Sequence, residues 1–200
     1  MTDLERALSG IAEVRERLAM TQRFKGYSGV AAAASGAFAV VAGVVQAVVV
    51  PLPQTAPQER AYFAIWIVCC AAAAIVNYGA IAHWFVSDES ARDRWQTRTV
   101  GLSILPALVL GAALSFALFE GGASRYLPGV WFGCYAVGLF ASRTMIPRAA
   151  TGIAAALLLA GIALLFAPAS IALSWWILPA GFGVAQMTIG ALLLRERSAR

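Results

Sequence analysis

The side chains best suited to chemistry in this largely apolar chain are amides and hydroxyls. Asn77, Tyr78 and Gln186 lie within long apolar runs, and Ser35 lies in an earlier run. These groups donate and accept hydrogen bonds but do not titrate near neutral pH, so they suit hydrogen bonding better than proton transfer. If each run is a helix that rises 1.5 Å per residue, Ser35, Asn77 and Gln186 lie roughly 12 to 13 Å from the same end of the bundle.

This polar layer allows two interpretations. Asn77, Tyr78, Gln186 and Ser35 could line a small cavity that binds a ligand or a lipid headgroup and opens toward the cytoplasmic leaflet. Alternatively, they form hydrogen bonds between helices, which contribute about 0.6 kcal/mol each on average inside a membrane, while small residues let the helices approach closely. The small residues concerned are Ala32, Gly36, Gly43, Gly181, Gly183 and Gly190.

The other reactive groups form no recognised catalytic or metal-binding pattern. His83 is the only histidine, and Cys69, Cys70 and Cys134 have no CxxC or Cys/His spacing. Metal and haem sites need several converging donors. None of the ten acidic residues lies in the middle of an apolar run, where a proton-coupled carrier would need one. We therefore expect no enzymatic activity, no cofactor and no metal.

Six apolar runs must hold these residues. Hydrophobic residues make up 60% of the 200 residues and charged residues 12%, and the mean hydropathy is +0.76. Such values indicate a bilayer rather than water as the surrounding solvent. A helix of about 20 apolar residues crosses the hydrocarbon core. We predict an all-α, polytopic membrane helix bundle with spans at about 27–50, 61–86, 100–119, 127–142, 149–166 and 171–194.

Particular residues mark the limits of several runs. Pro51 and Pro53 end the first run, Pro128 suits the first turn of the fourth, and Pro106 could kink the third. A charged connector, residues 87–99, precedes the third run. The fourth run is short, so it fits either a full crossing or a partial helix covered by its neighbours.

Basic residues alternate along the chain in a way that orients the spans. Lysine and arginine number five before the first span, then one, three, one, two and none in the successive gaps, and three in the tail. Basic residues are retained on the cytoplasmic side, so both termini and the second and fourth gaps are predicted to be cytoplasmic. Their scatter argues against a nucleic-acid surface, which gathers basic residues on one face.

The N-terminal segment is charged throughout and should not cross the membrane. Thr2 and Glu5 have the spacing of a capping box, and apolar residues recur on one helical stripe. Such an amphipathic helix lies at the cytoplasmic interface or docks on the bundle, or alternatively binds a partner protein. We divide the chain into this helix (1–25), the six-span bundle (26–195) and a polar tail (196–200). The apolar stripe consists of Leu4, Leu8, Ile11 and Leu18.

Several stretches stand out along the chain: Arg17-Leu18-Ala19-Met20-Thr21-Gln22-Arg23-Phe24 running into Tyr27-Ser28-Gly29, Arg94-Trp95, Leu127-Pro128-Gly129-Val130-Trp131, Tyr135-Ala136-Val137-Gly138, and Gly181-Phe182-Gly183 with Gly190. In these stretches the chain resembles an uncharacterised family of small bacterial multi-pass membrane proteins. The resemblance runs from about residue 16 to the C-terminus and implies six spans. In that family the position of Gln186 is often histidine, and a glutamine there cannot titrate near neutral pH. The family implies no established activity.

Together these patterns predict a non-enzymatic integral protein of a bacterial inner membrane that acts as an accessory, scaffold or sensor-like component. The alternative is a small transporter, or a membrane protein that binds a lipid or small molecule at the layer of Asn77 and Gln186. The expected partners are the lipid bilayer and a second protein or second copy that contacts the helix faces, with no nucleic acid.

Overall fold

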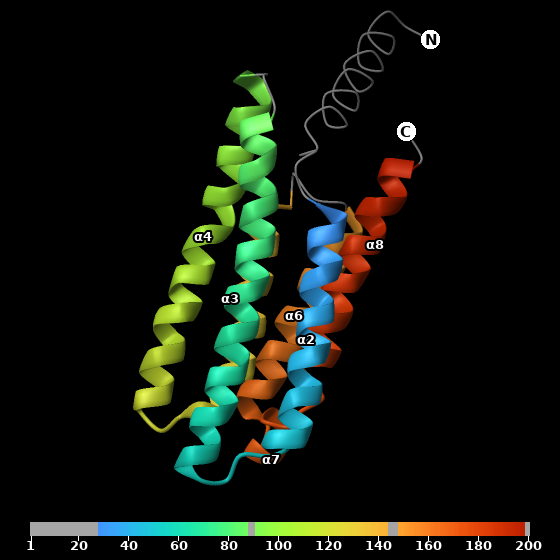
Figure 1. Cartoon of the computed structure of the whole chain (residues 1–200). Coiled ribbons are helices and arrows are strands. Elements are labelled where there is room, and N and C mark those ends of the chain that lie inside the picture. The colour runs from blue at the N-terminus through green and yellow to red at the C-terminus, as the bar shows by residue number, and fades with distance from the viewer. Residues whose placement is uncertain (1–27, 88–90, 144–147, 199–200) are drawn as a thin grey trace, which may run out of the picture.

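Apolar helices that run back and forth form an all-α bundle (Figure 1). The structure, a computed structural model, describes residues 28–87, 91–143 and 148–198, and these ranges contain helices and their connections without a strand. The long helices are α2 (Gly29–Val49), α3 (Ala56–Ser87), α4 (Ala91–Glu120), α5 (Leu127–Ala141), α6 (Arg148–Phe166) and α8 (Val184–Ser198). Shorter elements are the 3₁₀ turn η1 (Ser124–Tyr126), helix α7 (Ala169–Ala172) and the π-helical turn η2 (Pro179–Gly183).

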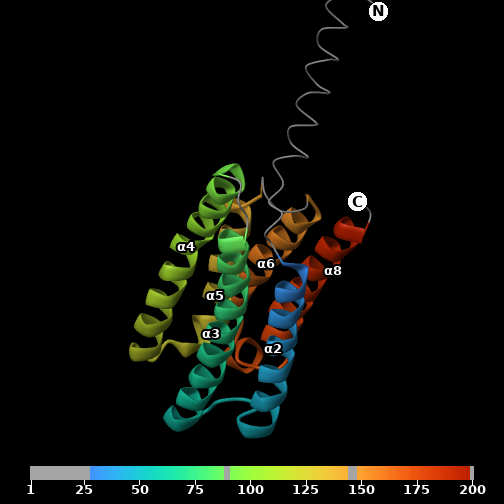
Figure 2. The same ribbon diagram turned by 45° about the horizontal axis from the view of Figure 1, so that its top comes forward.

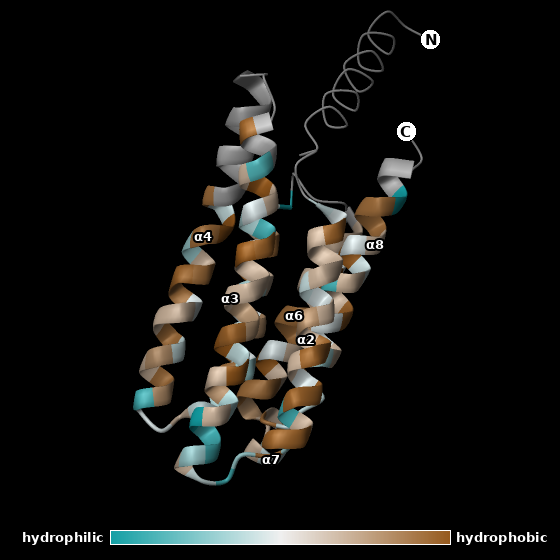
Figure 3. Ribbon diagram, in the orientation of Figure 1, coloured by the Kyte–Doolittle hydropathy of each residue, from teal (hydrophilic) through white to brown (hydrophobic). Residues whose placement is uncertain are grey.

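Successive long helices point in opposite directions, and α2 begins and α8 ends at the same end of the bundle (Figures 1 and 2). The α2–α3 link, η1 and α7 lie at the other end, which we call the distal end. Hydrophilic residues gather toward the helix ends, and the middle of the bundle is mostly apolar (Figure 3). This arrangement places polar groups at two levels separated by an apolar zone, as a bilayer requires.

Four helices in the described part of the chain are long and apolar enough to cross a membrane. They cover Gly29–Val49, Ala56–His83, Leu102–Glu120 and Ala149–Phe166, and so correspond to four of the six predicted spans. The fourth predicted span forms α5, which has 15 residues and a length of about 22 Å. Pro128 lies in the first turn of α5, as its position in the sequence predicts.

The last apolar run differs from the single helix predicted over 171–194. α7 ends at Ala172, a turn follows, and helix resumes just before η2 and continues as α8. Pro179 explains part of this break, because it has no backbone N–H to donate and its ring crowds the preceding turn. The π-helical turn η2 lies between the resumed helix and α8, as π-helical turns mostly occur as single turns inside α-helices.

The charged connector predicted over 87–99 is largely helical. α3 continues to Ser87 and α4 begins at Ala91, and the α3–α4 hairpin extends beyond the start of α2 (Figure 1). Hydropathy locates the part of a helix that fits in hydrocarbon, whereas the helix itself continues through polar residues that still favour helical backbone. Pro106 lies inside α4 without ending it.

Glycines set the closest helix contacts. A Cβ added to Gly36 would lie 2.8 Å from the Gly183 carbonyl oxygen, and one added to Gly29 would lie 2.9 Å from the Gly190 carbonyl oxygen. Gly129 of α5 meets Gly161 of α6 in the same way, at 2.8 Å. Small residues therefore bring α2 against η2 and α8, and α5 against α6, as expected for helix packing in a membrane.

The amphipathic helix predicted for residues 1–25, with Leu4, Leu8, Ile11 and Leu18, lies outside the described residues.

The core of the described bundle is built around the large side chains of Tyr62, Trp66, Trp131 and Phe132. Alanines on α2 and leucines on α5, α6 and α8 pack with them.

Candidate functional site

Two of the four residues of the predicted polar layer are joined by a hydrogen bond. Asn77 Nδ2 on α3 donates to Ser35 Oγ on α2 at 2.6 Å and to the Ala73 carbonyl oxygen at 2.8 Å. Ser35, which is buried, donates in turn to the Ala31 carbonyl oxygen at 2.9 Å. This pair has the geometry of the interhelical alternative, in which polar side chains tie two membrane helices together.

Tyr78 and Gln186 are not joined to that pair. The Tyr78 hydroxyl and Gln186 Oε1 are both buried, and neither has a hydrogen-bond partner in the described part of the protein. A buried acceptor or donor without a partner is destabilising, so such atoms mark places where another group would bind favourably. The polar layer is therefore a closed Ser35–Asn77 pair and two separate unsatisfied atoms.

The histidine and cysteines bring together no metal-binding cluster. His83 is exposed, and the three cysteines are free thiols. The described residues contain no group of three histidine, cysteine or acidic side chains close enough to hold a metal ion.

A second polar cluster, which the sequence analysis missed, lies nearer the distal end. Gln46 is fully buried (0% exposed), and its Nε2 donates to the Leu173 carbonyl oxygen at 2.8 Å. Its Oε1 accepts a hydrogen bond from Trp66 Nε1, also at 2.8 Å. One amide thus connects α2, α3 and the turn after α7. The signal in the sequence is a glutamine inside an otherwise apolar helix, because such a side chain must find partners within the protein.

Helices α4 and α5 share a similar link. Trp131 Nε1 donates to Ser115 Oγ at 2.6 Å, and Ser115 Oγ donates to the Gly111 carbonyl oxygen at 2.6 Å. Trp131 also stacks on Tyr62 with ring centroids 6.4 Å apart, so this link continues to α3. Satisfied indole and hydroxyl groups of this kind position helices in a lipid environment.

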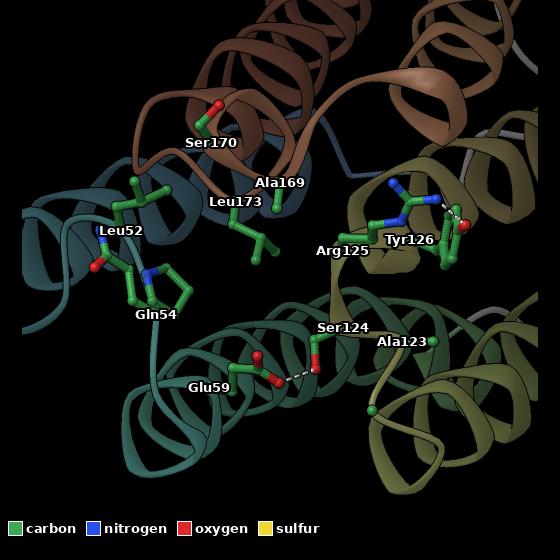
Figure 4. Close-up of a pocket in the computed structure, with 12 residues that line it drawn as sticks. Leu52, Gln54, Glu59, Ala123, Ser124, Arg125, Tyr126, Ala169, Ser170 and Leu173 are labelled. Atoms are coloured by element: carbon green, nitrogen blue, oxygen red, sulfur yellow. Dashed lines mark hydrogen bonds between the residues drawn. The ribbon is translucent and has the colours of Figure 1, made fainter.

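At the distal end a pocket of about 590 Å³ opens between four segments of the chain (Figure 4). Its wall combines charged, polar and apolar groups, as small-molecule sites do. The lining residues are Leu52, Pro53 and Gln54 from the α2–α3 link, Glu59 from the first turn of α3, residues 122–126 around η1, and Ala169, Ser170 and Leu173 from α7 and the turn after it.

Local structure at each wall explains how these segments are held. Gln58 Oε1 accepts hydrogen bonds from the backbone N–H groups of Gln54 and Thr55, at 2.9 and 3.2 Å, and so caps the start of α3. α4 ends in a Schellman motif, in which Ala123 N–H donates to the Leu118 carbonyl oxygen at 2.8 Å. Gly122 adopts the positive φ of 66° that this motif requires.

The pocket carries one acidic and one basic side chain. The Glu59 carboxylate accepts a hydrogen bond from the buried Ser124 hydroxyl at 2.8 Å. The Arg125 guanidinium lies over the Tyr126 ring, 4.2 Å from its centroid, and donates to the Tyr126 hydroxyl. Glu59 and Arg125 make these contacts rather than an ion pair with each other, and their side chains stand on different walls of the hollow (Figure 4).

The pocket wall is also tied to the core of the bundle. Leu173 lines the pocket, and its carbonyl oxygen is the acceptor for Gln46. Because Gln46 is held in turn by Trp66, the position of this wall depends on the packing of α2 and α3. The pocket is therefore held in a defined shape by the helices beneath it.

Comparisons with protein families, with curated proteins and with solved structures find no match to this chain. The four long apolar helices of the described residues are compatible with a membrane protein.

Proposed function

We propose that this chain is an integral protein of a bacterial inner membrane with six membrane-embedded passes and both termini in the cytoplasm. The observation that carries this proposal is the unequal charge of the two ends of the bundle. Arg60 and Arg125 lie at the distal end. The other thirteen basic residues precede α2, follow Leu194, or flank the α3–α4 and α5–α6 connections at the opposite end. The positive-inside bias makes the richer end cytoplasmic.

We further propose that the protein is a non-enzymatic accessory or scaffold component, with a sensor-like role as a variant of the same function. The exposure of α3 and α4 supports this. In the most apolar 18-residue stretch of each helix, 6% of the α3 stretch and 17% of the α4 stretch is buried inside the described protein, compared with 39% of the α2 stretch. Side chains such as Val68 and Ile75, which are 68% and 72% exposed, leave a broad apolar face for lipid and for neighbouring membrane helices.

Membership in the uncharacterised bacterial multi-pass family remains part of this proposal and rests on the resemblance of the sequence stretches. The N-terminal segment 1–25 is proposed as a second contact element on the cytoplasmic side. Its apolar stripe, with Leu4 and Leu8 at its start, suits either the membrane interface or a partner.

Purification in mild detergent followed by native mass spectrometry tests the accessory function. We expect a stoichiometric protein partner or a second copy to remain bound, and replacing Ile75 with Arg on the exposed face of α3 should release it. A Val48→Arg variant, on the exposed face of α2, is the matched control. A protein that stays monomeric and free of partners under conditions that preserve its fold contradicts the scaffold role. Deletion of residues 2–20 then shows whether the N-terminal segment contributes to association.

The second candidate function is binding of a lipid or small molecule near the polar layer. It is favoured by the buried Gln186 Oε1 and Tyr78 hydroxyl, which lack partners in the described protein. Retention of a lipid or metabolite that is lost in Gln186→Leu supports this function. A Gln186→Leu protein that folds, assembles and functions as before argues against it.

A further inference from the structure

The distal pocket lies at the depth where lipid headgroups meet the outer surface, if the bundle is oriented as proposed. Trp175 and Trp176 follow the lining residue Leu173 almost directly, and they are 43% and 49% exposed. Exposed tryptophans mark the interface between hydrocarbon and headgroups. Phe166, 85% exposed, precedes α7 on its other side. Exposed aromatic side chains thus flank α7, which forms one wall of the pocket, on both sides along the chain.

The charges of the pocket fit a ligand that carries both signs. Glu59 and Arg125 are the charged residues of its wall, and they are opposite in sign. One Glu59 oxygen accepts from Ser124, and the other faces the hollow (Figure 4). The Arg125 guanidinium has five N–H donors, of which the Tyr126 hydroxyl takes one. A guanidinium suits a phosphate, and a carboxylate suits an ammonium group.

The composition of the wall bears on which type of ammonium group fits it. A quaternary ammonium has no N–H to donate and is usually held by aromatic rings. Tyr126 is the aromatic residue of the lining, and Arg125 already covers its ring at 4.2 Å. A primary ammonium instead donates hydrogen bonds to a carboxylate such as Glu59. A purely anionic headgroup has no positive group of its own to pair with the Glu59 carboxylate.

We propose that the distal pocket binds a phosphoethanolamine-type zwitterion, with its primary ammonium at Glu59 and its phosphate at Arg125. Apolar wall residues such as Leu52 and Leu173 contact the hydrocarbon next to the headgroup. Two sources carry this chemistry, namely the headgroup of a membrane phospholipid and free phosphoethanolamine. The position beside Trp175 and Trp176 favours the lipid.

Binding is measured on the detergent-purified full chain with three short-chain phospholipids that differ only in headgroup: ethanolamine, choline and glycerol. We expect the ethanolamine lipid to bind about tenfold more tightly than either of the others. The choline and glycerol lipids lack the ammonium N–H that donates to Glu59, and the loss of one charge-assisted hydrogen bond has about this effect on affinity. Arg125→Gln should lower the affinity for the ethanolamine lipid about tenfold. Glu59→Gln should abolish the preference for the ethanolamine lipid over the choline lipid. Arg60→Gln and Glu120→Gln, which remove charges at the same end outside the pocket, are the matched controls.

Free phosphoethanolamine identifies the source. If it binds as tightly as the lipid, the ligand is a soluble zwitterion, and if it binds far more weakly, the ligand is the lipid. Equal affinity for all three headgroups, or Glu59→Gln and Arg125→Gln variants that behave as the controls while retaining helical content, overturns the proposal. Because the assay uses solubilised protein, its result does not depend on membrane orientation or on a protein partner. Failure of the scaffold function is therefore distinguishable from failure of this inference.

Discussion

The hydrogen bonds of Gln46 provide a direct test of how this bundle is held together. Its side chain is completely buried and forms two hydrogen bonds of 2.8 Å, one with Trp66 and one with the Leu173 carbonyl oxygen. Interhelical hydrogen bonds in membranes contribute about 0.6 kcal/mol on average and about 1.7 kcal/mol at most. Gln46→Leu keeps a similar volume and removes both bonds, so the free energy of unfolding should fall by about 1 to 3 kcal/mol.

A double-mutant cycle isolates the bond between the two side chains. Trp66→Phe removes the indole donor together with part of the buried ring volume, and the cycle subtracts the cost of that volume because the single variant carries it too. The coupling between Gln46→Leu and Trp66→Phe should be about 0.6 to 1.7 kcal/mol. Unfolding by sodium dodecyl sulfate in mixed micelles, followed by circular dichroism, measures these free energies. Thr188→Val is the control, because Thr188 is exposed and bonds only within its own helix, to the Val184 carbonyl oxygen. Zero coupling, or a Gln46→Leu variant as stable as Thr188→Val, refutes the reasoning.

Four further variants, at three glycines and at one residue of the polar layer, have expected effects on stability. Gly36→Ala should lower the free energy of unfolding by about 1 to 3 kcal/mol, because its Cβ would lie 2.8 Å from the Gly183 carbonyl oxygen. Gly79→Ala should be neutral or stabilising in the same assay, because its Cβ would lie more than 4 Å from the side chains and other helices described around it. Gly122→Val should be less stable by about 1 to 3 kcal/mol, since its φ of 66° strains a β-branched residue, and a thermal-unfolding shift on the purified protein measures this. Gln186→Leu should be at least as stable as the original chain, because Gln186 Oε1 makes no hydrogen bond that the substitution would remove. A marked loss of stability would contradict the statement that this oxygen has no hydrogen-bond partner.

Helix positions were the most predictable part of the fold, because they depend on local chemistry. The first apolar run ends before Pro51, the fourth begins at Leu127 with Pro128 in its first turn, and the fifth ends at Phe166. Proline restricts the backbone wherever it occurs, so these limits are visible in the sequence alone. The four-residue helix α7 was missed, because hydropathy does not distinguish a turn inside an apolar segment from continuous helix.

The candidate sites were less predictable, because their contacts join residues far apart in the chain. The Ser35–Asn77 bond follows from equal depth in neighbouring spans, which the 1.5 Å helical rise estimates well. Tyr78 lies on α3 and Gln186 on α8 at a similar depth, yet depth alone does not state which helices are neighbours or which way a side chain points. Gln46 could have been selected as a buried amide in an apolar helix, whereas its partners could not.

The distal pocket could not be predicted from any single pattern. Its wall combines two links, one helix start and one four-residue helix, and none of these has a periodic signal. Glu59 and Arg125 look like ordinary boundary charges in the sequence, and only the packing of the distal end brings them to one hollow.

Labelling of single cysteines tests the central claim, the orientation of the bundle in the membrane, most directly. In a background where Cys69, Cys70 and Cys134 are replaced with Ala, one cysteine is introduced at Gln54 of the α2–α3 link or at Arg143 after α5, both of which are exposed. The proposed topology predicts that a membrane-impermeant maleimide labels Gln54→Cys in intact spheroplasts and labels Arg143→Cys only after the membrane is disrupted. Labelling of both positions from the same side, or recovery of the intact chain from a lysate without detergent, would contradict it.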